Sequence, residues 1–336
     1  MTGILNSIIA LTPLLLLVIP SESTEDFFDP AERSVTLRYR GFFAVLVILH
    51  HMAQRVTEAG LIRIYIDIGY LAVAGFFFYS GYGLMKKGIE QKKGYFRRRL
   101  PGIILPYILT LVIYWIIYAL TGDVKNFGSL MAEHLHNTSG ISFLWFIFVY
   151  VFWIVFLGIA LKMIRSDIGI LYAAILFSAG FLGLFLVFIP SLYWIYDSIL
   201  LLPLGCAWAY YEKNVLRFIR EHYASVLLSS FLLFCVTLYR PASNVLRIAS
   251  YLVSAIVFMI LLNTVTMKRR PLSRILSFLG SISYEIYLLH GIPITFLRNV
   301  LPNEALWTLS VLIIAVLSAW MMHTLGRSTW NRRKAK

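Results

Sequence analysis

Charged residues are scarce in this chain. They make up only 14% of the 336 residues, whereas 60% are hydrophobic and the mean hydropathy is +0.78. A soluble domain needs roughly a quarter of its residues charged to cover its surface, so the composition excludes a soluble enzyme and a disordered chain. The hydrophobic residues fall in blocks of about 20, the length that spans a hydrocarbon core of ~30 Å. The composition therefore predicts a polytopic membrane protein whose surroundings are a lipid bilayer.

Cysteines and acidic residues are also few. The two cysteines, Cys206 and Cys235, lie in hydrophobic segments without CxxC or Cys/His spacing, so a disulfide scaffold is excluded and no metal site is expected. The 16 acidic residues are outnumbered by 30 basic ones. In a soluble protein this excess would suggest nucleic acid, but here the basic residues lie in short loops between hydrophobic segments. We therefore expect no nucleic acid partner and interpret these residues as determinants of membrane topology.

Eleven hydrophobic segments are candidates for transmembrane helices. The first is interpreted as an uncleaved extra helix, because it has no basic n-region and no small-residue cleavage site follows it. The predicted fold is an all-α bundle of ten core helices plus this N-terminal helix. We divide the chain into a helix and linker (1–33), a transmembrane domain (34–326) and a basic cytoplasmic tail (327–336). The predicted spans lie near residues 3–19, 36–53, 66–85, 103–121, 141–162, 168–188, 192–211, 223–239, 244–266, 277–297 and 305–325.

The positions of lysine and arginine predict the orientation of these spans. Basic residues near span ends are retained on the cytoplasmic side during insertion, and the basic run at 86–99 fixes one loop inside. Alternation from that loop leaves 24 of the 30 basic residues inside and 6 outside. We therefore expect a multi-pass protein of the bacterial cytoplasmic membrane with its C-terminus in the cytoplasm. The six outside are Arg55, Arg63, Lys125, Arg240, Arg247 and Arg298.

Ionisable residues inside a span cost about 2.5 to 3.5 kcal/mol at a helix centre, so each is a candidate functional group. Arg40 and His50 lie in one span, roughly 15 Å apart along a helix axis, and ten residues of rotation allow both to face one cavity. His51 points about 100° away and is not expected to share it. A neutral imidazole can accept a proton from a hydroxyl; the alternative role is a polar helix contact. Asp67 and Asp197 are interpreted as interfacial charges at outer helix ends.

The predicted span at 277–297 carries a second polar group. Tyr284 and Tyr287 follow one another along one stripe of the helix, while Glu285 and His290 are intramembrane groups that need partners. They could line a site for a substrate, or Glu285 could orient a neighbouring helix through a hydrogen bond. Both interpretations are retained.

Three consecutive arginines, Arg97, Arg98 and Arg99, directly precede Pro101 at a predicted cytoplasmic end. Guanidinium groups suit phosphates because they donate two parallel hydrogen bonds. The alternative is the ordinary excess of basic residues on the cytoplasmic side.

In this order the motifs resemble acyltransferase family 3, membrane proteins that move acyl groups from acyl-CoA to glycans and other acceptors. The segment from Arg40 to His50 resembles the family signature, an Arg followed by ten residues and a His. The resemblance covers roughly residues 34 to 325, although Pro101-Gly102 stands where the family often has a further basic residue. The other matching segments are Phe77-Phe78-Tyr79-Ser80-Gly81-Tyr82-Gly83, Arg98-Arg99-Leu100 through Leu105-Pro106-Tyr107, Leu144-Trp145-Phe146, Pro203-Leu204-Gly205 and 279–290.

The resemblance implies an enzyme that transfers an acyl group, most commonly acetyl from acetyl-CoA, to a hydroxyl of a surface or exported carbohydrate. It implies that Arg40 and His50 form the functional core, that His50 acts on the acceptor, and that arginines bind the acyl-CoA. No metal is expected. The alternative is a small transporter or flippase that uses intramembrane His, Arg and Glu, but its usual pair of matching broken segments is not evident. The His-x4-Asp motif of glycerolipid acyltransferases is missing.

Overall fold

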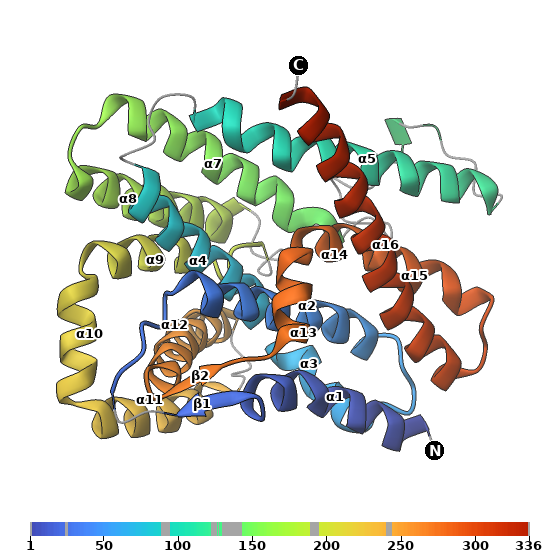
Figure 1. Ribbon diagram of the computed structural model, residues 1–336, viewed down its shortest axis with the longest axis horizontal. Helices are drawn as coiled ribbons and strands as arrows, with labels where there is room; N and C mark the ends of the chain where they lie inside the picture. The colour runs from blue at the N-terminus through green and yellow to red at the C-terminus, as the bar shows by residue number, and fades with distance from the viewer. Residues whose placement is uncertain are drawn as a thin grey trace.

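Helices make up most of the residues that the computed structural model describes (Figure 1), which confirms the all-α prediction. The structure describes residues 2–23, 26–88, 95–121, 126, 128–129, 143–188, 195–239 and 244–334. The elements are α1 (Thr2–Val18), β1 (Ser21–Ser23), α2 (Arg33–Ala53), η1 (Gly60–Arg63), α3 (Ile64–Ile68), α4 (Tyr70–Gly88), α5 (Tyr95–Leu120), α7 (Trp145–Met163), α8 (Asp167–Phe188), α9 (Leu201–Tyr210), α10 (Glu212–Glu221), α11 (Tyr223–Thr237), α12 (Asn244–Lys268), β2 (Arg269–Pro271), α13 (Arg274–Ser281), α14 (Ser283–Leu289), α15 (Gly291–Phe296), η4 (Leu297–Asn299) and α16 (Glu304–Lys334).

Every predicted span overlaps a helix or a series of short helices, but not every one is a single long span. Within the described ranges, five helices are long and apolar enough to cross a membrane, or up to eight if each bent pair is one span. The predicted span at 277–297 is broken at Ile282 and at His290, and the parts before and after Ile282 are bent by 64° relative to each other. Helices α1 and α9 are apolar but have only 17 and 10 residues. The structure thus supports a multi-pass membrane protein, while the count of ten core helices plus one stays a prediction.

Contacts between loops agree with the predicted alternation. Strand β1 pairs antiparallel with β2, two segments that the charge bias places on the same side. The side chains of Tyr82 and Lys86 both contact Glu212 at the start of α10, again between segments predicted to lie inside. Glu304, predicted to lie outside, accepts hydrogen bonds from the backbone N–H of Thr57 (2.9 Å) and of Glu58 (3.0 Å). The orientation relative to the cytoplasm stays a prediction.

Helix α2 is packed among α3, α4, α13 and α14 at the centre of the bundle (Figure 1). Its crossing with α13 requires two glycines, because a Cβ at Gly41 would lie 2.1 Å from the carbonyl oxygen of Leu276, and one at Gly280 would lie 1.8 Å from that of Leu37. Small residues allow such close approach between helices in a membrane. The crossing brings the segment that begins at Arg40 beside the segment that contains Tyr284.

Candidate active site

Two cavities lie on α2, one near each of the two residues singled out in its sequence. The first, about 460 Å³, is called here the histidine cavity. The second, about 300 Å³, is called the arginine cavity. The ring of Tyr287 lines both. The histidine cavity is lined by Val47, His50, His51, Gln54, Ile66, Asp67, Gly69, Tyr70, Val73, Phe143, Trp145, Asp197, Tyr251 and Tyr287; the arginine cavity is lined by Arg40, Phe76, Tyr79, Ser80, Gly102, Ile103, Phe146, Tyr150, Ser283, Tyr284 and Tyr287.

Arg40 and His50 therefore do not share one cavity, contrary to the expectation from their angular spacing. The expectation used rotation about the helix, but the roughly 15 Å of axial separation places the two side chains at different depths. Between those depths the rings of Phe43 and Phe76 pack edge to face, with centroids 5.8 Å apart. The pair is thus divided by an aromatic layer.

The hydrogen bonds of His50 define its tautomer. Its Nδ1 lies 2.7 Å from the carbonyl oxygen of Tyr65, which can only accept, so Nδ1 carries the proton. Its Nε2 lies 3.0 Å from the amide nitrogen of Gln54, which can only donate, so Nε2 accepts. A neutral imidazole held through Nδ1–H, with Nε2 as the acceptor nitrogen, can act as a general base once a substrate hydroxyl replaces the Gln54 amide as the donor to Nε2.

His51 lines the histidine cavity together with His50, so the expectation that it would not share this space is wrong. A cavity of this width receives side chains that leave the helix about 100° apart. The Nδ1–H of His51 donates to Oε1 of Gln54 over 3.4 Å, so one amide group joins the two histidines. Counting along the chain, nine residues separate Arg40 from His50 and ten separate it from His51. The spacing of the family signature, an Arg followed by ten residues and a His, thus fits His51 and not His50, and the expected match to His50 is wrong by one residue.

The other predicted residues of the late segment occupy three different environments. Tyr284 lines the arginine cavity, and its hydroxyl donates to the carbonyl of Ile103 at 2.6 Å. His290 is fully buried, lines neither cavity, and stacks on His51 with ring centroids 5.2 Å apart. Glu285 lines neither cavity and lies 2.7 Å from Nδ1 of His323 on α16. The contact of Glu285 matches the alternative in which it orients a neighbouring helix.

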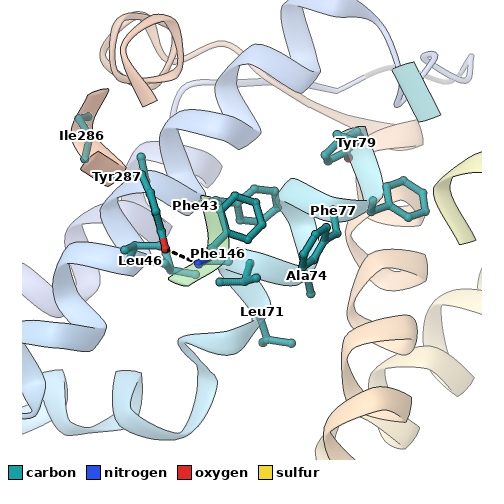
Figure 2. Packing of buried hydrophobic residues seen from close by; sticks show 14 of the residues in the cluster. Phe43, Leu46, Leu71, Ala74, Phe77, Tyr79, Phe146, Ile286 and Tyr287 are labelled. Atoms are coloured by element: carbon teal, nitrogen blue, oxygen red, sulfur yellow. Dashed lines mark hydrogen bonds between the residues drawn. The ribbon is translucent and has the colours of Figure 1, made fainter. Parts of the chain in front are cut away.

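Tyr287 lies between the two cavities, because it lines both of them. Its hydroxyl donates to the carbonyl of Phe143 and accepts from the backbone N–H of Phe146 at 3.3 Å, a bond that is dashed in Figure 2. The rings of Tyr287 and Phe146 pack edge to face at 5.3 Å, and Phe77 packs on the other side of Phe146 at 4.9 Å. Figure 2 shows this partition beside Phe43 of α2. The hydroxyl of Tyr287 is therefore already used to hold the start of α7.

The arginines before Pro101 are described only in part. Arg97 and Arg98 lie in the first turn of α5, but their side chains fall outside the described residues. The guanidinium of Arg99 lies over the ring of Tyr95, 5.3 Å from its centroid. Helix α5 also supplies Gly102 and Ile103 to the arginine cavity, so that cavity lies next to the basic end of the helix.

Three polar residues of the histidine cavity are not among the site residues that the sequence predicts. Asp67 and Asp197 both line the cavity; Asp67 is exposed, as an interfacial charge would be, whereas Asp197 is only 3% exposed. Gln54 could be found from the sequence, because it follows His50 by four residues, a spacing that brings side chains together at a helix end. No such signal exists for Asp197, because the cavity joins segments far apart in the chain. Among the described residues, no group of three or more His, Cys, Asp or Glu side chains could hold a metal ion.

Gln54→Glu is expected to slow any reaction that uses His50 as a base, by about 10-fold or more. A carboxylate cannot donate to Nε2, so the pair can bond only when a proton occupies the lone pair that the base needs. Gln54→Leu, which leaves that lone pair open, is expected to lose less. The measurement is the turnover of the purified variants.

The control for Gln54→Glu is Glu58→Gln, the reverse exchange at an exposed neighbouring position. It is expected to keep wild-type turnover. Equal turnover of Gln54→Glu and wild type would show that Gln54 does not act on His50.

Comparison with known proteins adds one finding to this geometry. A family model described as an acyltransferase domain matches residues 39–332, from α2 to the last turns of α16. No curated protein and no solved structure matches the chain. The matched range contains both cavities and leaves out α1.

Proposed function

The chain belongs to acyltransferase family 3, and from this membership we propose that it transfers an acyl group from acyl-CoA on one side of the membrane to a hydroxyl on the other. The family and the apolar helices identify the chain as a membrane acyltransferase. Transfer between substrates on opposite sides of the membrane is supported by one observation. Arg40 and His50 lie on one helix and line two different cavities, and Tyr287 lines both of these cavities.

The arginine cavity is the proposed site for the acyl-CoA. No acidic side chain among the described residues forms an ion pair with Arg40, which is exposed in this cavity. The basic start of α5 lies beside the cavity, on the side where the charge bias predicts the cytoplasm and thus acyl-CoA. Guanidinium groups would bind the phosphates, and the pantetheine arm would extend along the cavity toward Tyr287.

The histidine cavity is the proposed site for the acceptor. Its aromatic residues and its amide and carboxylate groups combine apolar surface with a few polar groups, as small-molecule sites do. Such a lining suits a sugar ring, which supports a surface or exported carbohydrate as the acceptor and acetyl as the group transferred. The proposed location is the bacterial cytoplasmic membrane with the C-terminus inside.

In the proposed reaction, Nε2 of His50 takes the proton of the acceptor hydroxyl. The oxygen attacks the thioester carbonyl carbon, the C–S bond breaks, and the departing thiolate of CoA receives the proton from the imidazolium. General-base catalysis contributes typically about 10² to 10⁴-fold. Alignment of the two substrates at Tyr287 would supply much of the remainder. The Tyr65 carbonyl stabilises the imidazolium through the Nδ1–H bond.

Acetyl-CoA is expected to raise the thermal stability of the purified protein. A ligand at about 100 times its dissociation constant adds roughly 2.7 kcal/mol to the free energy of unfolding. Arg40→Gln and the double variant Arg98→Ala/Arg99→Ala are expected to lose most of this shift. The measurement is the unfolding midpoint in detergent with acetyl-CoA, with succinyl-CoA and with CoA alone.

The double variant Lys213→Ala/Arg217→Ala is the matched control, because it also removes two positive charges from exposed positions on α10. Its shift is expected to equal that of wild type. A folded wild-type protein that shows no shift with any CoA species would count against the acyl-CoA proposal and favour the transporter or flippase.

A further inference from the structure

We propose that the N-terminal helix α1, although it lies outside the family domain, is a positioning element that sets the orientation of His50 through Tyr65. The inference rests on the proposed role of His50. It concerns a helix for which neither the sequence nor the family match suggests a function.

Helix α1 is fixed in place by polar contacts that an apolar membrane anchor would not need. Asn6 is fully buried, and its amide nitrogen donates to the carbonyl of Glu58 at 2.8 Å. Thr308 of α16 donates to the other amide atom of Asn6 at 3.3 Å. A buried amide costs free energy unless it is hydrogen-bonded, so these contacts fix how α1 sits against the segment that follows α2.

The segment at 58–63 approaches the backbone of α1 very closely. The backbone N–H of Leu61 donates to Oγ of Ser7 at 3.0 Å. Gly60 has a φ of +52°, and a Cβ there would lie 2.3 Å from the carbonyl oxygen of Gly3. Glycine permits both the left-handed backbone and the contact. At Gly60 the turn is thus fitted to α1, while the start of the segment is held by α16, through the bond from the backbone N–H of Glu58 to Glu304.

Tyr65 links this docked segment to His50. Its hydroxyl donates to the carbonyl of Ala10 in α1 at 2.6 Å, and its own carbonyl accepts the Nδ1–H of His50 at 2.7 Å. Tyr65 is 4% exposed, so its ring is held between the two contacts. Displacement of α1 would move the acceptor that fixes the proton on Nδ1 and leaves Nε2 as the basic nitrogen.

The link continues beyond His50. The Gln54 amide bonded to Nε2 of His50 also accepts from Nδ1 of His51, so the orientation of one ring constrains the other. Small displacements of a reacting group by a distant change can cost about 100-fold in rate. The arginine cavity contains no residue of α1 or of the segment at 58–65, so acyl-CoA binding should not depend on this link.

The test uses Tyr65→Phe in the full chain, which keeps the buried ring and removes its bond to α1. We expect kcat to fall by about 10-fold or more, while the stability shift with acetyl-CoA and the KM for acetyl-CoA stay within about two-fold of wild type. Nitrogen-15 NMR of histidine-labelled protein, with His50 assigned by its loss in His50→Gln, is expected to show His50 as the Nδ1–H tautomer in wild type and as a mixture in Tyr65→Phe. Ser7→Ala, which removes the acceptor for Leu61, is expected to change kcat and the NMR signal in the same direction.

The matched control is Tyr39→Phe, another buried tyrosine whose hydroxyl donates to a backbone carbonyl, that of Leu262. It is expected to leave kcat and the His50 signal unchanged. Wild-type kcat and a wild-type His50 tautomer in both Tyr65→Phe and Ser7→Ala would overturn the role of α1. If His50→Ala itself keeps activity, the assignment of the base fails instead, so the two failures are distinguishable.

Discussion

His50→Ala is expected to lower kcat for acyl transfer by about 10² to 10⁴-fold while the stability shift with acetyl-CoA remains. The variant removes the imidazole that Tyr65 holds through Nδ1 and Gln54 through Nε2, at the edge of the histidine cavity. Donor binding should survive, because the arginine cavity lies beyond Tyr287 and does not include His50. Release of free CoA from acetyl-CoA, measured in proteoliposomes supplied with envelope glycans, reports the transfer.

The companion variant for this experiment is His51→Ala. His51 lies in the same cavity and has the ten-residue separation from Arg40, so it is the first alternative for the base. Retained activity in His50→Ala together with loss in His51→Ala would assign the base to His51. Retained activity in both would reject general-base catalysis from this cavity, since His290 is sealed behind His51.

Gly280→Val is expected to prevent folding into the membrane-embedded state. A Cβ at this position would lie 1.8 Å from the carbonyl oxygen of Leu37, and the atom in its way belongs to a backbone that cannot change rotamer. Overpacked cores lose typically about 1 to 3 kcal/mol when side chains can adjust; a collision with the backbone of a central helix should exceed that range. The measurement is the yield of monodisperse protein after extraction in detergent.

Gly83→Ala on α4 is the control for Gly280→Val, because a Cβ there would have no atom within 4 Å. It is expected to express and purify like wild type. Normal yield and normal acetyl-CoA response of Gly280→Val would show that α2 and α13 can separate without loss of structure, which would contradict the tight crossing described above.

The positions of the helices could be predicted from the sequence because a hydrocarbon core demands long apolar runs. The break at Ile282 and the amphipathic helix α10 could not be predicted in this way. A bend within an apolar run does not change the length of the run, and neither does a short helix between two spans. Helix α10 is bent by 96° from α11 and carries basic side chains such as Arg217 and Arg220 among apolar ones.

The residues that α2 contributes to the candidate site could be predicted from the sequence, but the residues that other helices bring to it could not. Helical periodicity gives the direction of Arg40 and His50 from their own axis, but it does not describe what fills the space between them. The aromatic partition depends on Phe146 and Tyr287, which come from segments that only the folded chain brings to α2. For the same reason Tyr287 is better described as a residue of the partition, while its predicted contact with a substrate stays a prediction.

The partition at Tyr287 also bears on bioenergetics. Moving one charge across a membrane potential of 100 mV is worth about 2.3 kcal/mol, so a continuous file of water through the bundle would let protons flow down this gradient. The histidine and arginine cavities are both lined by Tyr287. Its hydroxyl is fixed by two backbone groups, the carbonyl of Phe143 and the N–H of Phe146. In the proposed reaction, a ring fixed between the two substrate cavities would interrupt a file of water through the bundle, and the transfer would then occur without a proton leak that dissipates the energy stored across the membrane.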